Sequence, residues 1–179
     1  MVQISFRLLY KIAKIIFFQL NYTFLDADDY HPIENKILMS HGVSLNDKQR
    51  EPWLLKLHEK LQELRALKDN GAILACSALK SKYRRFLNYG LNESNNCLNL
   101  KFILLEIDYD LVESRLNSRN HEFVKGSSIL KAQFETLEVS EDLNFVLKLT
   151  IDKSVEACVE ELLSFLHNNE NTAQIQQNF

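Results

Sequence analysis

Three apolar runs along the chain restrict the fold more than any other feature of the sequence. They are AILAC (72–76), LKFILLEID (100–108) and FVLKLTID (145–152), and the first two are apolar almost throughout. Runs of this length and composition are typical of strands that are buried on both faces, as the strands of a parallel sheet are. Helical patterns fill the segments between them. Strands that alternate with helices predict an α/β fold, with a parallel sheet flanked by helices in three layers.

Two of the helical segments are well marked. The segment 51–71 has Pro52 in its predicted first turn and Gly71 as its stop, and one face carries Leu54, Leu57, Leu61 and Leu64. The segment 77–90 begins at Ser77, a favourable cap residue, and ends near Gly90. Near the N-terminus, apolar residues recur at helical spacing and predict a core helix: Leu9, Ile12, Ile16 and Leu20.

Charge and cysteine content exclude several classes of protein. With 179 residues the chain is most simply one domain, and its net charge of -3 gives no basic face for a nucleic acid. Basic residues at 7, 11 and 14 interrupt the N-terminal apolar stretch, so we expect no membrane span. The cysteines at 76, 97 and 158 are odd in number and far apart. This pattern favours reduced thiols in an intracellular protein, here expected in the cytoplasm, and no structural metal site.

The residues that can carry chemistry follow the predicted strands. DADDYHP (26–32) follows a strand that ends at Leu25, CSALK (76–80) follows the strand at 72–76, and IDYD (107–110) follows the strand at 100–108. In open parallel sheets, ligands bind at the carboxyl ends of the strands. The three loops therefore predict the rim of an active site.

The acidic cluster DADDYHP has two interpretations. If the segment is extended, Asp26 and Asp28 face the same way, so one could lie near a divalent ion and the other near a substrate hydroxyl. Alternatively, Asp28 or Asp29 only caps the next helix, with Pro32 in its first turn. Both interpretations stay open on these residues alone, and an isolated histidine such as His31 is more often structural.

Basic residues gather at three further places. Arg50 precedes a predicted helix, and Arg115 and Arg119 are four residues apart, so they share one helix face and could clamp a phosphate. The N-terminal half of another predicted helix carries Lys80, Lys82, Arg84 and Arg85. The helix dipole disfavours cations there, so either an anionic ligand or a carboxylate of the chain would stabilise them. A basic face in contact with solvent is the alternative.

Taken together and in order, these motifs resemble a known family. The stretches DADDYHP, NDxxRxPWL, CSALK, ESRLNSR and QFETLE are similar to those of the small, single-domain gluconokinases, which are related to shikimate kinase among the P-loop kinases. The resemblance covers residues 11–167 and implies a nucleoside-monophosphate-kinase-like fold. Residues 1–10 do not resemble the family, and we expect the polar segment 168–179 to be a disordered tail.

The resemblance also implies an activity and a set of roles. The family transfers the γ-phosphoryl group of ATP to the 6-hydroxyl of D-gluconate, with Mg²⁺, and forms 6-phospho-D-gluconate. By this resemblance, Asp28 would hold the substrate hydroxyl and act as its base, and Asp26 would lie near the Mg²⁺ ion. Further substrate contacts would come from His31, Arg50, Lys80 and Arg84, and the lid over the phosphates from Arg115 and Arg119. The segment around His121 departs from the usual lid sequence.

One part of the family pattern is missing from this chain. P-loop kinases need a first strand and a loop of the form G-x-x-x-x-G-K-[ST], whose backbone N–H groups hold the phosphates. The glycines of the chain are at 42, 71, 90 and 126, and Leu9 and Tyr10 stand where the lysine and hydroxyl residue belong. In this fold the first strand lies in the middle of the sheet. We expect the strand and P-loop to be lost, or the strand to be vestigial over 2–6, with helix from about residue 5.

Three hypotheses for function follow. The first is a gluconokinase whose present N-terminus is an alternative to one that carries the loop. The second is an inactive protein that still binds D-gluconate or pairs with an intact subunit, and a homodimer is an open alternative under either hypothesis. A metal-dependent hydrolase, which the acidic cluster alone could suggest, ranks below both because the basic motifs fit a phosphate-transfer site better.

Overall fold

The computed structural model describes residues 3–67, 71–91, 97–98, 100–106, 131–139, 145–150 and 152–176. In chain order the labelled elements are α1 (Gln3–Leu20), β1 (Thr23–Asp26), η1 (Ala27–Tyr30), α2 (Ile33–Ser40), α3 (Asp47–Ala66), β2 (Ala72–Ala75), α4 (Ser81–Tyr89), β3 (Phe102–Glu106), β4 (Phe145–Thr150) and α7 (Val155–Gln176). Residues 131–136 are also helical. Each of the three apolar runs contains one of the strands β2, β3 and β4, and β1 ends close to where the sequence predicted.

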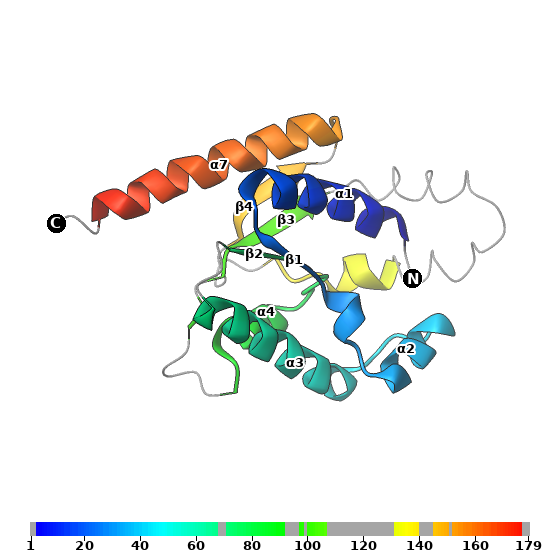
Figure 1. Cartoon of the computed structure of the whole chain (residues 1–179). Helices are drawn as coiled ribbons and strands as arrows, with labels where there is room; N and C mark the ends of the chain where they lie inside the picture. Colours follow the sequence, from blue (N-terminus) through cyan, green and yellow to red (C-terminus); the bar gives the residue numbers. More distant parts are fainter. Residues whose placement is uncertain are drawn as a thin grey trace.

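The strands form two parallel pairs between two layers of helices. β1 pairs with β2 from Thr23↔Ala72 to Asp26↔Ala75, and β3 pairs with β4 with a register shift after Phe102. Figure 1 shows α1 and α7 on one side of the strands, and α3 and α4 on the other. The predicted three-layer α/β architecture with parallel strands is confirmed.

The two strand pairs are separate sheets in the described part of the chain. β2 and β3 are not hydrogen-bonded to each other, and no described strand lies between them in the sheet order. They share an apolar cluster whose buried residues come from α1, β4 and α7, and against which Ile73 of β2 and Ile103 of β3 pack. Helix α1 therefore contributes to a core that both sheets share. The N-terminal segment is helical from Gln3, as expected from residue 5 onward, and residues 3–6 do not form a vestigial strand.

The core on the α1 side follows the predicted helix face. Ile12 and Ile16 are buried against Leu149 of β4, and α7 closes the cluster with Cys158, Val159 and Leu162. No helix within the described ranges is long and apolar enough to cross a membrane.

Helix α3 begins four residues earlier than its sequence pattern suggested. Its start is set by a capping box, in which Asn46 Oδ1 accepts a hydrogen bond from the Gln49 N–H at 3.0 Å and Gln49 Oε1 accepts one from the Asn46 N–H at 2.9 Å. Pro52 consequently lies inside the helix rather than in its first turn. The predicted apolar face is confirmed, and α3 buries Trp53, Leu54, Leu57, His58, Leu61 and Leu64.

Two other helix ends differ from the sequence prediction. Helix α4 begins at Ser81 and not at Ser77, because residues 77–80 form a turn that is held by contacts from elsewhere in the chain, described below. Helix α7 continues through residues 168–176, which were expected to be a disordered tail. Adding a residue to an existing helix is much easier than starting one, so an amide-rich sequence can extend α7 despite its modest helix propensity.

The C-terminus of α4 is locked against α3 by one glycine and one histidine. Gly90 has a φ of 69°, a left-handed conformation that disfavours any side chain, and a Cβ added there would overlap the His58 ring. His58 is buried, and its Nδ1 lies 2.8 Å from the Leu87 carbonyl oxygen. Close contact between the two helices therefore requires glycine at position 90.

We predict that Gly90→Ala lowers the free energy of unfolding by about 1–3 kcal/mol, since it combines a strained φ with a steric overlap. Urea denaturation of both proteins measures the difference. In a His58→Ala background the overlap is gone and only the strain remains, so the same substitution should cost less there. An equal cost in both backgrounds would contradict the proposed contact.

Candidate active site

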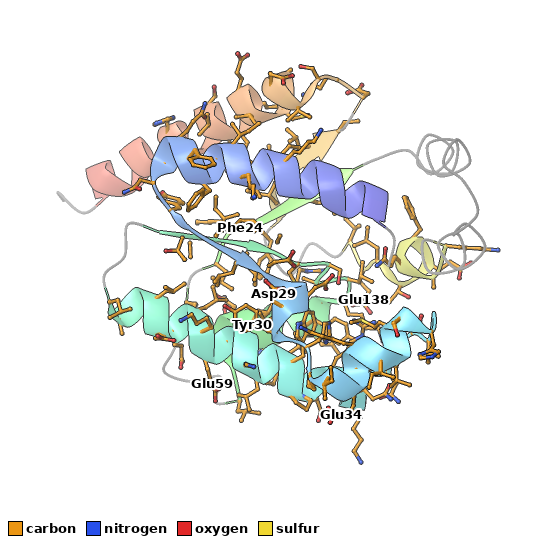
Figure 2. The ribbon with its side chains drawn as sticks, turned by 45° about the vertical axis from the view of Figure 1, so that its right-hand side comes forward. Phe24, Asp29, Tyr30, Glu34, Glu59 and Glu138 are labelled. Atoms are coloured by element: carbon orange, nitrogen blue, oxygen red, sulfur yellow. The ribbon has the colours of Figure 1, made fainter. Side chains whose placement is uncertain are left out.

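The two motif-bearing loops that the structure describes start at the same edge of one sheet. Asp26 ends β1 and pairs in register with Ala75, which ends β2, so DADDYHP and CSALK both begin at the carboxyl ends of parallel strands. Figure 2 shows Asp29 and Tyr30 where β1 passes into η1. The third predicted loop, IDYD, and the residues Arg115, Arg119 and His121 lie outside the described residues.

The acidic cluster is a helical turn and not the extended segment considered above. Asp26 Oδ1 accepts a hydrogen bond from the Asp28 N–H at 3.0 Å, so Asp26 caps the 3-10 helix η1. Asp28 lies within that turn and is half-buried, while Asp29 is exposed. The capping interpretation is also wrong for the residues it named, because neither Asp28 nor Asp29 caps α2, which has Pro32 at its N-cap without a side-chain bond. The residue of the cluster that caps a helix is Asp26.

Trp53 fixes this turn to α3. Its Nε1–H donates to the Ala27 carbonyl oxygen at 2.7 Å, and the His31 ring stacks on it with ring centroids 4.4 Å apart and an angle of 9° between the planes. Trp53 is 1% exposed and His31 is 6% exposed. Both ends of the turn that carries Asp28 are thus held by one indole side chain.

The environment of the turn shifts the pKa values of its titratable groups. Burial raises the pKa of Asp28, and the neighbouring carboxylates of Asp26 and Asp29 add to the effect, while Lys36 opposes it. Burial, together with the charges of Arg50 and Lys36, lowers the pKa of His31 to about 4. His31 is therefore neutral at pH 7, and its Nδ1 has no hydrogen-bond partner among the described residues.

Arg50, near the start of α3, lies beside Tyr83 of α4. Its Nε–H donates to the Leu45 carbonyl oxygen at 3.3 Å, and its guanidinium lies 5.8 Å from the centre of the Tyr83 ring. Its charge acts on His31, as noted, and also on Cys76, the residue after β2. Burial raises the pKa of that thiol to about 12, with smaller contributions from Asp28 and Asp26, so the thiol is protonated at neutral pH. The charge of Arg50 therefore acts both on His31, which follows η1, and on Cys76, which follows β2.

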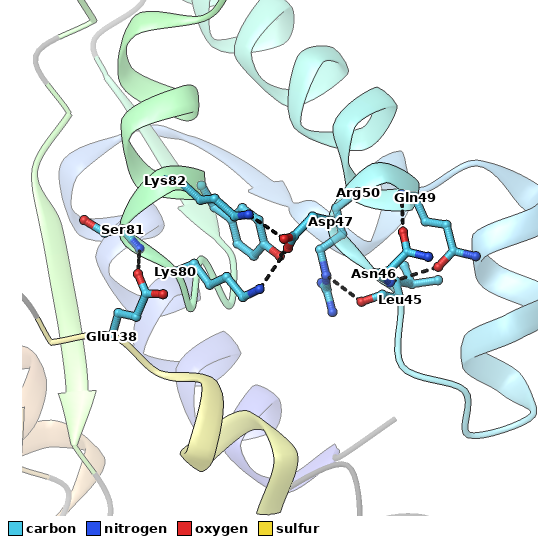
Figure 3. A network of polar contacts seen from close by, with 10 residues as sticks. Leu45, Asn46, Asp47, Gln49, Arg50, Lys80, Ser81, Lys82 and Glu138 are labelled. Carbon is cyan, nitrogen blue, oxygen red and sulfur yellow. Dashed lines mark hydrogen bonds and ion pairs between the residues drawn. The ribbon is translucent and has the colours of Figure 1, made fainter.

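A carboxylate of the chain balances the basic residues at the start of α4. Asp47 accepts a hydrogen bond from Lys80 Nζ at 2.9 Å and further hydrogen bonds from Lys82 and from the Tyr83 hydroxyl (Figure 3). These three donors, Lys82 first, hold the pKa of Asp47 well below its usual range. Burial and the Asp47 hydrogen bond raise the pKa of Tyr83 to about 12. The sequence left open whether a ligand or a carboxylate stabilises these cations. For Lys80 and Lys82, the carboxylate of Asp47 does so.

The guanidinium group of Arg84 donates hydrogen bonds to backbone carbonyl groups. Arg84 is 0% exposed, and its Nη1 donates to the Ala78 and Leu79 carbonyl oxygens at 2.8 and 3.0 Å. Its Nη2 donates to the Glu138 carbonyl oxygen at 2.5 Å. Arg84 therefore shapes the turn 77–80, and the substrate contact assigned to it from the resemblance stays a prediction, as do the roles of Asp26, Asp28, His31, Arg50 and Lys80.

Sequence reasoning missed four residues that organise this site: Asp47, Trp53, Tyr83 and Glu138. Asp47 and Trp53 belong to the NDxxRxPWL motif, so the motif signalled them without indicating what they do. Glu138 ends the QFETLE motif, which likewise did not indicate its role, and no local signal pointed to Tyr83, whose partner Asp47 is distant in sequence. Among the described residues, no group of three His, Cys, Asp or Glu side chains could hold a metal ion.

Known proteins with similar sequences are gluconokinases. The chain is 36% identical over 156 residues to the thermoresistant gluconokinase of Escherichia coli (strain K12), which is 87% of this chain and 85% of that protein. It is 32% identical over 167 residues to a gluconokinase of Arabidopsis thaliana, covering 89% and 87% of the two chains. The chain belongs to the gluconokinase family. No family model matches it.

A solved structure supports the same assignment. The crystal structure of a gluconokinase from Sinorhizobium meliloti 1021 superposes with a TM-score of 0.76 at 28% identity, over 94% of this chain and 90% of that one. The gluconokinase resemblance and the P-loop kinase fold that it implied are thereby confirmed. By family, the chain is a kinase homologue.

Because the pKa of His31 is lowered in the folded protein, we predict that stability depends on pH. Its pKa is about 4 in the folded state and near 6.5 when unfolded, so between these values the unfolded chain binds more protons. The free energy of unfolding should therefore fall as the pH falls from 6.5 to 4, by at most about 1.4 kcal/mol per pH unit for one proton. His31→Phe keeps a ring against Trp53 but cannot titrate, so urea denaturation across this pH range should show a shallower slope. The same change at exposed His167 should leave the slope unaltered.

The raised pKa of Asp28 predicts the opposite effect on stability: the charged form of this side chain should destabilise the folded protein. A carboxyl group whose pKa is raised by folding binds its proton more tightly in the folded state, so its ionised form destabilises the protein above that pKa. Asp28→Asn should therefore raise the melting temperature at pH 7, because the asparagine side chain carries no charge to bury. Asp29→Asn, at the exposed neighbour, should change it little. A lower melting temperature for Asp28→Asn would contradict this account.

Proposed function

We propose that the chain binds D-gluconate at the carboxyl ends of β1 and β2, and that this site serves ATP-dependent phosphorylation of the 6-hydroxyl to give 6-phospho-D-gluconate. The observation that carries the proposal is the turn after β1, fixed by Trp53, which carries half-buried Asp28 with its raised pKa beside buried His31, whose pKa the charge of Arg50 helps to lower. The membership of the gluconokinase family supports the choice of substrate.

The residues on the acceptor side have a consistent division of roles. Asp28 accepts a hydrogen bond from the substrate hydroxyl and takes its proton, a role that a raised pKa favours near neutral pH. The neutral ring of His31 hydrogen-bonds a sugar hydroxyl. Arg50 and Lys80 bind the sugar-acid carboxylate, and Arg84 supports them by holding the turn that Lys80 follows.

The residues present fit a magnesium ion that is held mainly through water. Mg²⁺ typically keeps several waters and takes one or two carboxylates together with substrate phosphates. Asp26, at the end of β1, can supply such a carboxylate, although one of its oxygens also caps η1. When bound, the ion would neutralise phosphate charge.

The residues present do not fit the phosphates of ATP. The sequence has no G-x-x-x-x-G-K-[ST] stretch, and the described N-terminal segment is helix from Gln3. In addition, β2 and β3 are unpaired with each other, and no described strand fills the place between them. We therefore assign no step of phosphoryl transfer to this chain alone, and propose that turnover requires a phosphate loop in addition to the residues described.

The missing loop equally favours the second hypothesis, a gluconate-binding protein that does not turn over ATP or that pairs with an intact subunit. Both hypotheses place D-gluconate at the same site, at the carboxyl ends of β1 and β2. Location in the cytoplasm and a homodimeric state are part of the proposal and stay predictions. The metal-dependent hydrolase has no three-residue ligand group among the described residues to support it.

Calorimetry with D-gluconate tests the acceptor site. We expect the chain to bind D-gluconate and Asp28→Asn to weaken binding about 10- to 100-fold, because a hydrogen bond to a charged group is lost. Asp29→Asn, which changes the same charge at an exposed position next to it, should bind normally. Absence of binding by the unmodified chain would overturn the proposal.

Turnover then separates the first two hypotheses. A steady-state assay with ATP, Mg²⁺ and D-gluconate is run on this chain and on one whose N-terminus carries a glycine-rich loop. If the loop-bearing chain phosphorylates gluconate and this chain does not, the acceptor residues are competent and only the donor side is missing. If neither turns over but both bind gluconate, the inactive binding protein is the correct hypothesis.

A further inference from the structure

Glu138 forms hydrogen bonds to the segment around the start of α4 through both its backbone and its side chain. Its N–H donates to the Leu79 carbonyl oxygen at 2.9 Å, and its own carbonyl oxygen accepts from Arg84. Its carboxylate oxygen Oε2 accepts from the Ser81 N–H at 2.7 Å. Figure 3 shows this last bond beside the Lys80–Asp47 ion pair. A single residue, 57 positions away from Ser81, thus makes three hydrogen bonds to the segment 79–84.

Helix α4 lacks a cap of its own and obtains one from Glu138. The residue at its N-cap is Lys80, which makes no side-chain cap bond. The first N–H groups of a helix have no partner inside the helix, and the positive end of the helix dipole disfavours the cations Lys80 and Lys82. A carboxylate on the Ser81 N–H satisfies one of these donors and supplies the negative charge that the helix end needs.

The turn that leads into α4 is strained. Ala78 has a φ of 33°, in the left-handed region that residues other than glycine rarely adopt. Its carbonyl oxygen is held by Arg84. Conformations of this kind persist only where surrounding contacts determine them, and they gather at functional sites. The contacts that determine this one come from Arg84 and Glu138.

The position of Lys80 depends on this turn. Lys80 lies between the Leu79 carbonyl and the Ser81 N–H, both bonded to Glu138, and its Nζ reaches Asp47 at 2.9 Å. We propose that Glu138 is a positioning residue for substrate binding: by capping α4 from outside, it holds Lys80 where Lys80 can bind the sugar-acid carboxylate. This inference rests on the proposed function for the role of Lys80, but its structural part can be tested without a ligand.

The ligand-free test uses Asp47 as a reporter. Lys80 is one of the three donors that hold the pKa of Asp47 below its usual range. If Glu138→Ala releases Lys80, the Asp47 carboxyl should titrate at a higher pH, as measured by carbon NMR of the full chain. Glu138→Gln still offers an oxygen to the Ser81 N–H, so it should restore most of the unmodified behaviour. Unchanged Asp47 titration in a folded Glu138→Ala protein would overturn the proposal.

A matched control lies three residues away. Glu135 is exposed, and its carboxylate is 3.9 Å from Lys131 in the same helical segment. Glu135→Ala removes the same charge and the same atoms without touching the turn. It should leave the Asp47 titration unchanged, and a shift equal to that of Glu138→Ala would show that the effect is only one of net charge, against the proposal.

The binding test is a double-mutant cycle with D-gluconate. We expect Glu138→Ala to weaken gluconate binding about fivefold, the effect of losing a helix cap. In a Lys80→Ala background the same change should have little further effect, because the residue through which Glu138 acts is gone. Additive losses would show that Glu138 acts only on general stability, and would overturn the proposal.

The two tests separate failure of this inference from failure of the proposed function. If the unmodified chain does not bind D-gluconate, the proposed function fails, while the Asp47 titration still decides whether Glu138 positions Lys80. If the unmodified chain binds but Glu138→Ala binds equally well, the proposed function stands and this inference fails.

Discussion

The hydrogen bond from the Trp53 indole to the Ala27 carbonyl is the contact on which the candidate site most depends. It joins α3, which buries an apolar face, to the short turn that carries Asp28. The same indole stacks on His31, so the turn is held at its first and last parts by one rigid side chain. A tryptophan can do both because its ring is a large apolar surface with one polar edge. Apolar packing of Ala27 and Tyr30 adds to this contact.

Charge compensation within the chain shapes the opposite side of the site. Several cations lie at the start of α4, where the helix dipole disfavours positive charge. Two carboxylates from distant segments of the chain offset this unfavourable interaction. Asp47 binds Lys80 and Lys82, and Glu138 caps the helix. Arg84 is buried, and its Nη1 and Nη2 donate to backbone carbonyl groups. Arg50 donates to the Leu45 carbonyl oxygen, and its charge helps to lower the pKa of His31. This combination of acidic and basic groups is the basis for proposing a sugar acid, which carries one carboxylate and several hydroxyls, as the ligand.

The two sheets are not hydrogen-bonded to each other in the described part of the chain, and this affects both the stability of the fold and its proposed function. In parallel folds each strand is usually buried on both faces and bonded on both edges. Here a core formed by residues of α1, β4 and α7 contacts both pairs, and α1 contributes Ile12 and Ile16 to it. The same helix occupies the N-terminal part of the chain, where the family resemblance implies a strand and a phosphate loop. The residues proposed to bind D-gluconate are thus present in the described structure, while the sequence has no glycine-rich phosphate loop.

The sequence by itself determined the local elements, because periodicity and turn residues act over a few positions. The strands, the apolar face of α3, the core helix at the N-terminus and the family all followed from it. It failed where a partner far along the chain decides the outcome. The start of α4 shifted to Ser81 because Glu138 and Arg84 hold the preceding turn, and the extended interpretation of DADDYHP failed because Asp26 and Trp53 fold it into a turn. Which cations have carboxylate partners, and which carboxyl group has a raised pKa, depends on burial and on contacts across 30 to 60 residues, and only the tertiary structure supplies these.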